Sequence, residues 1–248
     1  MTIDPLAPLL ELADIAPAVE RARERFDQAL RHRALRRHGG QVAAEVSLRS
    51  AVASAALEGY AHDREAVRAG TVTEPVLQGA LRVAGALPGL SELWPKAPRQ
   101  ALAKLHVLAA RDVVAEAELG RPVADPVVAT RLDGLAGLAA GGTKVSPLVL
   151  AAVVHGELLN LRPFAGPSGL VARGAARLVL LSSGFDPRGL LAVDVGHQQR
   201  EPEYVGSAGA FATGTPDGLR SWLRHYMTAV EVGADQLTAI GDEILAAA

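Results

Sequence analysis

The sequence predicts an all-α protein. Alanine, leucine, valine and glycine dominate its 248 residues, and aromatic residues make up only 4%. Apolar residues recur with helical spacing, and no series of alternating strand-like segments is found. Because the chain has no internal repeat and no convincing interdomain linker, one helical domain is the simplest organisation.

Glycine and proline mark the ends of the expected helices. Asp125-Pro126, Ser146-Pro147 and Thr215-Pro216 each pair a capping side chain with a proline at the first helical position. Gly59 and Gly184 are expected to end helices. The expected helices are 17–36, 41–58, 74–94, 98–114, 125–140, 146–161, 168–183 and 215–247, with breaks at 87–89 and 95–98 and a bend near Gly233. Residues 186–214 are rich in glycine and predict no clear element.

Composition excludes several classes of function. A net charge of -2 argues against general polyanion binding, so no nucleic-acid partner is expected, and we interpret Arg31, Arg33, Arg36 and Arg37 as a solvated helix end. Without cysteine there is no disulfide and no thiolate metal site. The first residues do not resemble a signal peptide, and no apolar run is long enough to span a membrane. We therefore expect a soluble cytoplasmic protein.

One stretch carries a family resemblance. Residues 162–173 read RPFAGPSGLVAR and resemble the Fic motif HPFx(D/E)GNGRxxR, keeping Pro163, Phe164, Gly169 and Arg173. In that family the loop cradles phosphates before a helix, and the protein transfers AMP from ATP to a hydroxyl. The resemblance implies a Fic-like helical domain over 41–248, with 1–40 as a helical extension. It also places a short β-hairpin flap at 127–145, although these residues show no clear hairpin pattern.

The motif positions that carry chemistry differ from the family pattern. Arg162 replaces the histidine that acts as general base, and a guanidinium stays protonated and cannot accept a proton. Gly166 replaces the metal-binding carboxylate, so Mg²⁺ loses its ligand and no metal site is expected. Pro167 removes an N–H donor, and Leu170 replaces a phosphate-binding arginine. Metal-dependent AMP transfer is therefore not expected.

An anion site is nevertheless expected at this loop. Ser168 is expected to cap the following helix, and Gly169 allows close backbone approach. Arg162, Arg173 and Arg177 would supply positive charge, the last two on one helix face. The predicted ligand is ATP or another nucleotide.

A second motif precedes the loop. Ser54, Glu58 and Gly59 fit the Fic inhibitory pattern (S/T)xxxE(G/N), in which the glutamate pairs with the last arginine of the loop motif. The resemblance thus implies a Glu58–Arg173 pair. Since a buried charge needs a partner, we interpret this pair as a structural tie between helices.

Three functions remain open from the sequence. The first is a degenerate Fic-fold module that binds a nucleotide or anion, or a protein, for regulation. The second is a Fic-type transferase with a relocated base, for which His155, about two helical turns before Arg162, and His197 are the candidates. The third is a structural subunit of a homo-oligomer.

Overall fold

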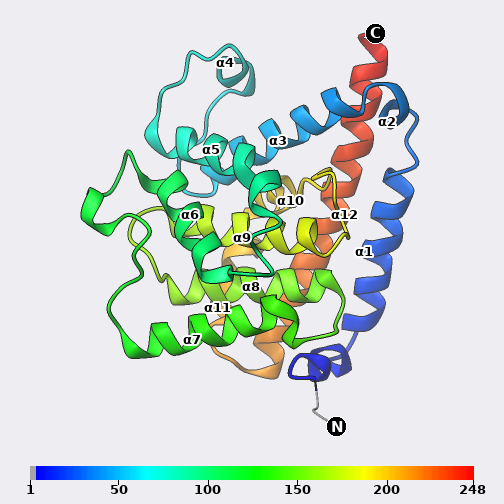
Figure 1. Ribbon diagram of the computed structural model, residues 1–248. Coiled ribbons are helices and arrows are strands. Elements are labelled where there is room, and N and C mark those ends of the chain that lie inside the picture. Colours follow the sequence, from blue (N-terminus) through cyan, green and yellow to red (C-terminus); the bar gives the residue numbers. More distant parts are fainter. Residues whose placement is uncertain (1–3) are drawn as a thin grey trace.

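The computed structural model describes residues 4–248, and within this range it contains helices and loops without strands (Figure 1). In chain order the elements are η1 (Ala7–Glu11), α1 (Ile15–Ala29), α2 (Ala34–Arg37), α3 (Gly39–Ala56), α4 (Arg64–Arg68), α5 (Pro75–Leu90), α6 (Pro98–Ala110), η2 (Glu116–Glu118), α7 (Pro126–Gly137), η3 (Leu138–Gly142), α8 (Pro147–Leu161), α9 (Ser168–Ser182), α10 (Val193–Gln199), α11 (Glu201–Phe211) and α12 (Pro216–Ala246). The predicted all-α class is confirmed.

Helices α8 and α9 form the centre of the molecule. They pack against each other, and the 162–168 loop joins them. Helices α3, α5 and α6 pack on α9, while α11 and α12 pack on α8. Most of α9 is buried because its apolar residues surround the helix rather than forming one stripe. The loop therefore joins two largely buried helices that pack closely against each other.

The N-terminal segment belongs to the same core. Helix α1 packs along α12, which is continuous from Pro216 to Ala246, and both lie on one side of the molecule in Figure 1. Ile15 and Phe26 on α1 are buried in the same apolar cluster as α8 and α9. Residues 1–3 lie outside the described residues. They belong to the predicted N-terminal extension and to the segment that does not resemble a signal peptide.

Three predicted helix starts are confirmed with their caps. The Asp125 carboxylate accepts from the N–H of Val127, the Ser146 hydroxyl from Leu148, and the Thr215 hydroxyl from Gly218. In each case proline follows the cap, where its missing N–H costs no hydrogen bond. Gly59 and Gly184 adopt positive φ after α3 and α9.

Other expectations were wrong. The helix predicted over 17–36 is broken between α1 and α2, and Pro88 lies inside the last turn of α5 instead of ending it. No hairpin forms over 127–145, because α7 and η3 occupy most of this segment. Residues 186–214 contain α10 and α11, whose short helices carry no clear apolar periodicity.

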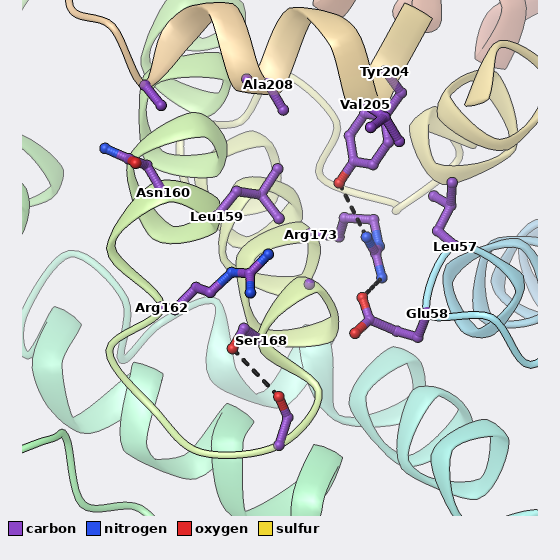
Figure 2. A pocket seen from close by; sticks show the side chains of 14 residues that line it. Leu57, Glu58, Leu159, Asn160, Arg162, Ser168, Arg173, Tyr204, Val205 and Ala208 are labelled. Atoms are coloured by element: carbon purple, nitrogen blue, oxygen red, sulfur yellow. Dashed lines mark hydrogen bonds and ion pairs between the residues drawn. The ribbon is translucent and has the colours of Figure 1, made fainter. Parts of the chain in front are cut away.

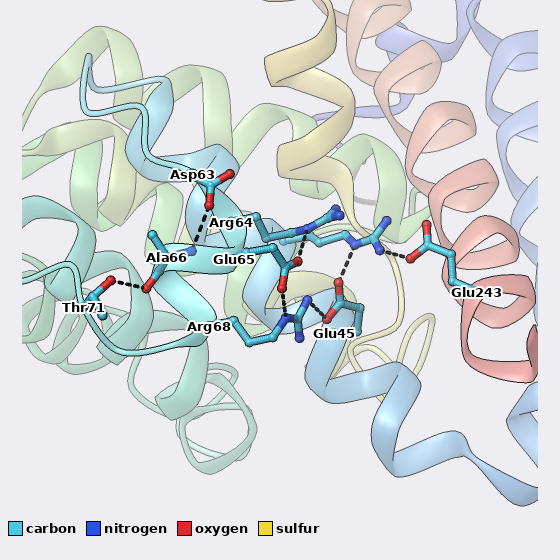
Figure 3. A network of polar contacts seen from close by, with 9 residues as sticks. Glu45, Asp63, Arg64, Glu65, Ala66, Arg68, Thr71 and Glu243 are labelled. Carbon is cyan, nitrogen blue, oxygen red and sulfur yellow. Dashed lines mark hydrogen bonds and ion pairs between the residues drawn. The ribbon is translucent and has the colours of Figure 1, made fainter. Parts of the chain in front are cut away.

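A polar network ties α3, α4 and the end of α12 together (Figure 3). Arg49 is buried and pairs with both Glu45 and Glu243, and Arg68 pairs with Glu45 at 2.8 Å. The Asp63 carboxylate caps α4 by accepting from Ala66. Between residues 4 and 248, no helix has both the length and the apolar character needed to cross a membrane.

Candidate functional site

A pocket of about 660 Å³ opens beside the 162–168 loop (Figure 2). The loop and the start of α9 form one wall, α11 forms the opposite wall, and the turn after α3 closes one end. Its lining residues are Leu57, Glu58, Leu159, Asn160, Arg162, Gly166, Ser168, Gly169, Arg173, Tyr204, Val205, Ala208, Gly209 and Ala212. The structure thus brings together most of the residues that the sequence predicted for the site.

Arg162 is the exposed charge of this pocket. It caps the C-terminus of α8 in the left-handed conformation (φ 43°, ψ 58°), which is uncommon for a residue with a side chain. Figure 2 shows its side chain extending into the pocket beside Leu159 and toward Ser168. Among the described residues, no carboxylate forms an ion pair with Arg162. Its guanidinium is therefore available to an anion.

Gly166 and Leu170, where the resemblance implies a carboxylate and an arginine, are surrounded by apolar side chains. Gly166 has φ 74°, and a Cβ there would lie 2.7 Å from Cγ1 of Val114. Leu170 is 1% exposed and belongs to the apolar core. Neither residue presents a polar side chain to the pocket.

The start of α9 differs from the expectation for Ser168. Ser168 is the first helical residue, Pro167 is the N-cap, and no side chain caps this helix. The Ser168 hydroxyl instead donates to the carbonyl of Phe164 (3.3 Å) or Gly166 (3.4 Å). Within residues 4–248, the N–H of Gly169 has no backbone or side-chain acceptor, so this helix start keeps a free donor.

The Glu58 carboxylate lies close to Gly169 at the start of α9. A Cβ at Gly169 would overlap Oε1 of Glu58, so only glycine lets this carboxylate lie over the helix start. The macrodipole of α9 favours negative charge there. Glu58 therefore lies where the helix favours an anion.

Arg173 is buried beneath Glu58 and uses all its nitrogens. Nε donates to the Ser54 hydroxyl (2.7 Å), and Nη2 donates to the Ser54 carbonyl (2.9 Å) and to Oε1 of Glu58 (2.7 Å). Nη1 donates to the hydroxyl of Tyr204 at 3.1 Å. Burial opposes its charge, but Tyr204, Glu58 and Asp194 together raise the pKa of Arg173 above its ordinary value. Arg173 is thus a fixed charge in the floor of the pocket.

Arg177 does not line the pocket. Its Nη1 lies 3.7 Å from Oδ2 of Asp194, and Nε of Arg173 lies 3.9 Å from Oδ1 of the same carboxylate. Burial raises the pKa of Asp194, and the two arginines oppose that effect. Arg177 and Asp194 therefore extend the buried charge network behind the site.

Neither candidate histidine reaches the pocket. Nε2 of His155 lies 3.0 Å from the Tyr204 hydroxyl, and Nδ1 of His197 lies 3.0 Å from Nε2 of His225. The Tyr204 hydroxyl accepts from Arg173, which leaves its own proton able to be donated to Nε2 of His155. Burial lowers the pKa of His155 and of His197 well below the ordinary value. These rings lie behind Arg173, among Trp222, Tyr226 and Tyr204.

Three residues around the site were not predicted from the sequence: Tyr204, Asp194 and His106. Tyr204 and Asp194 pair with Arg173 across the fold, and His106 binds the loop from α6. No local motif surrounds any of them, because each contact joins segments far apart in the sequence. For Tyr204 and Asp194, the one available signal was that a buried Arg173 needs several polar partners.

Comparison with known proteins identifies the fold. No protein-family model matches the chain, and no curated protein matches it. Among solved structures, Fic-1 from C. elegans is similar with TM-score 0.71 and 19% identity, over 94% of this chain and 74% of that chain. A variant of Fic-1 gives 0.70 and 18% over 95% and 74%. A Fic family protein from Desulfovibrio desulfuricans G20 gives 0.67 and 22% over 96% and 76%. The chain therefore has the Fic fold.

Proposed function

We propose that this Fic-fold chain binds a phosphate-bearing ligand, such as a nucleotide, in the pocket of Arg162 without transferring AMP. The observation that carries the proposal is the exposed, unpaired guanidinium of Arg162 beside the uncapped start of α9. A guanidinium favours a phosphate, and the N–H of Gly169 offers one further donor beside Glu58.

The opposite wall of the pocket suits an apolar part of the same ligand. Val205, Ala208, Gly209 and Ala212 follow one another at helical spacing along α11 and line the pocket. Ala208, Gly209 and Ala212 have small side chains, which leave room at this wall for a base or another ring. A pocket of about 660 Å³ is also within the usual size of small-molecule sites, roughly 300–1,000 Å³.

The same geometry argues against AMP transfer. A general base must reach the attacking hydroxyl, and neither His155 nor His197 lines the pocket. The Glu58 carboxylate does line it, but it is held by the charge of Arg173. Loss of a positioned base costs about 10²–10⁴ in rate, and loss of charge stabilisation a further factor of about 10²–10³.

Binding without turnover would make the chain a regulatory module. In that role the occupied pocket, or the α11 surface around Val205, would be recognised by a protein partner. Val205 is 62% exposed and stands at the pocket wall, which is the observation that favours a partner here.

Calorimetry at pH 7 with ATP, ADP, GTP and sulfate tests the binding. Arg162→Asn removes the charge while keeping a residue that tolerates the left-handed conformation. Because a charge-assisted hydrogen bond contributes about 1.5–3 kcal/mol, affinity for the bound probes is expected to fall at least about tenfold. Arg31→Asn, at an exposed turn remote in sequence from the loop, is the matched control and should bind like the wild type.

Two outcomes would contradict the proposal. One is a wild-type protein that responds to none of the four probes. The other is an equal loss in Arg162→Asn and Arg31→Asn, which would mean that only net charge matters. Incubation with labelled ATP and Mg²⁺ tests the second half, and label transferred to any protein would show that AMP transfer persists.

A further inference from the structure

His106 on α6 joins the 162–168 loop to the segment between α6 and α7. The ring is completely buried. Nε2 lies 2.8 Å from the carbonyl oxygen of Ala165, and the N–H of Gly120 donates to Nδ1 at 3.0 Å. The ring also stacks on Phe164 with a centroid distance of 4.8 Å. One side chain thus binds two separate backbone segments and an aromatic ring.

The two hydrogen bonds fix the tautomer of His106. A backbone N–H can only donate, so Nδ1 must be the unprotonated nitrogen. The proton is then on Nε2, where it is donated to Ala165. Burial lowers the pKa of His106 and keeps this neutral form. The His106 ring therefore donates through Nε2 to a carbonyl and accepts through Nδ1 from an N–H. No other standard side chain offers this donor and this acceptor at the same two positions.

The loop is anchored on one side only. Besides the bond from His106, the N–H of Val123 donates to the carbonyl of Pro163 at 2.9 Å, so both anchors hold residues 163–165. Within the described part of the chain, the backbone N–H groups that follow have only local acceptors: the Ser168 N–H donates to Gly166 and the Leu170 N–H to Pro167. The direction in which Gly166 and Ser168 leave Ala165 hence depends on these anchors.

His106 differs from the other buried histidines in the number of ring nitrogens that form hydrogen bonds. His155, His197 and His225 each have a ring nitrogen without a hydrogen-bond partner, whereas both nitrogens of His106 are paired. Full pairing of a buried group restricts its position, since any movement leaves a buried donor or acceptor unmade.

We propose that His106 is the positioning residue of the 162–168 loop, and that its bond to Ala165 places the start of α9 and Arg162 for an anion. The placement of the loop stands on the geometry alone, while its consequence for anion binding rests on the proposed function. Burial lowers the pKa of His106, and among residues 4–248 Glu118 is the one charged group that acts on it, in the opposite direction. The role is therefore one of hydrogen-bond geometry rather than of charge pairing.

Two substitutions separate the two hydrogen bonds. In His106→Gln the amide group reaches the place of Nε2 and can donate to Ala165. In His106→Asn it reaches only the place of Nδ1 and can accept from Gly120. Leu237→Ala, in the fully buried part of α12, is the control for a general loss of stability. Hydrogen exchange of residues 162–170 in the ligand-free full chain is the readout.

We expect hydrogen exchange of the loop to be at least about fivefold faster in His106→Asn, because losing one hydrogen bond changes an opening equilibrium by about fivefold. In His106→Gln the exchange rate should stay within about twofold of the wild type. Leu237→Ala should accelerate the loop no more than it accelerates the remaining helices. Sulfate affinity should follow the loop, falling in His106→Asn and not in His106→Gln.

Equal acceleration in both His106 variants, or acceleration that only follows global stability, would overturn the positioning role. Loop exchange is measured without ligand, so it decides the role of His106 even if the wild type binds no sulfate. That second result would contradict the proposed function instead.

Discussion

Arg162 and Arg173 belong to one motif but lie in opposite environments. Arg162 is exposed, forms no ion pair with any described residue and occupies the left-handed region, whereas Arg173 is 2% exposed and donates four hydrogen bonds. The first can change without disturbing the core. The second holds three parts of the chain together: the end of α3, α11 and α9. The difference teaches that the surface of this pocket and its floor are subject to separate constraints.

The largest expected effect comes from removing the buried arginine. Arg173→Leu leaves Glu58, Asp194 and Tyr204 without their shared cation, and breaking a buried pair costs about 3–5 kcal/mol. Urea unfolding should show this loss. Arg99→Leu is the matched control: it breaks the exposed Arg99–Asp133 pair, which should change the free energy of unfolding by less than about 1 kcal/mol. Equal losses in the two variants would remove the distinction between floor and surface.

Glu58 should have an intermediate effect. Its side chain is 19% exposed, and Arg173 keeps Ser54 and Tyr204 when it is lost. Glu58→Ala is therefore expected to lower the free energy of unfolding by about 1–3 kcal/mol. It should not create AMP transfer, because no base is restored. Glu58→Gln, which keeps an acceptor for Arg173, should lose less. ATP-dependent labelling of protein by Glu58→Ala would show that the carboxylate inhibits a competent site.

The histidine cluster behind the pocket floor should also make the protein sensitive to acid. Burial lowers the pKa of His225 to about 4, against about 6.5 in an unfolded chain. The unfolded state then binds more protons between pH 4 and 6.5, so stability is complete above pH 6.5 and falls as the pH decreases through this window. The lowered pKa values of His155 and His197 act in the same direction.

We expect a loss of about 1–2 kcal/mol between pH 7.5 and pH 5, measured by urea unfolding. The raised pKa values of Asp186 and Asp194 act against it, since they stabilise the folded state at low pH. His225→Phe should reduce the pH dependence while Arg162→Asn leaves it unchanged. Stability that rises on acidification would contradict the neutral state of these histidines.

The smallest effect on stability is expected at the exposed arginine. Arg162→Gly removes the left-handed strain, worth about 1–2 kcal/mol, but adds the conformational entropy of glycine, about 0.5–1 kcal/mol. The free energy of unfolding should thus change by less than about 1 kcal/mol, while anion binding is lost. A drop as large as that of Arg173→Leu would show that Arg162 is structural.

The elements with local causes could be predicted from the sequence. Caps followed by proline determine the starts of α7, α8 and α12, and positive-φ glycines follow the ends of α3 and α9. The break after α1 carries no glycine or proline and was missed. The role of Ser168 was wrong because Pro167 takes the capping position and the hydroxyl turns back to the loop.

Only the site residues that lie within a local sequence motif could be predicted. The motif that resembles the Fic pattern pointed to Arg162, Gly169 and Arg173, and the second motif pointed to Glu58; all four line the pocket. Tyr204 and His106 entered through contacts between distant segments, which depend on tertiary packing. The direction of Arg177 was misjudged because a shared helix face does not say which neighbour covers it.

The packing of Gly166 limits which side chains this position can carry. An aspartate at this position would have to adopt φ 74° and displace the Val114 methyl group, and Val113 and Ala110 lie just beyond. A carboxylate placed at 166 would therefore meet the end of α6 and its following turn, which pack against this position. Val114 would have to be replaced by a smaller residue at the same time, so an acidic side chain here requires coordinated changes in two segments.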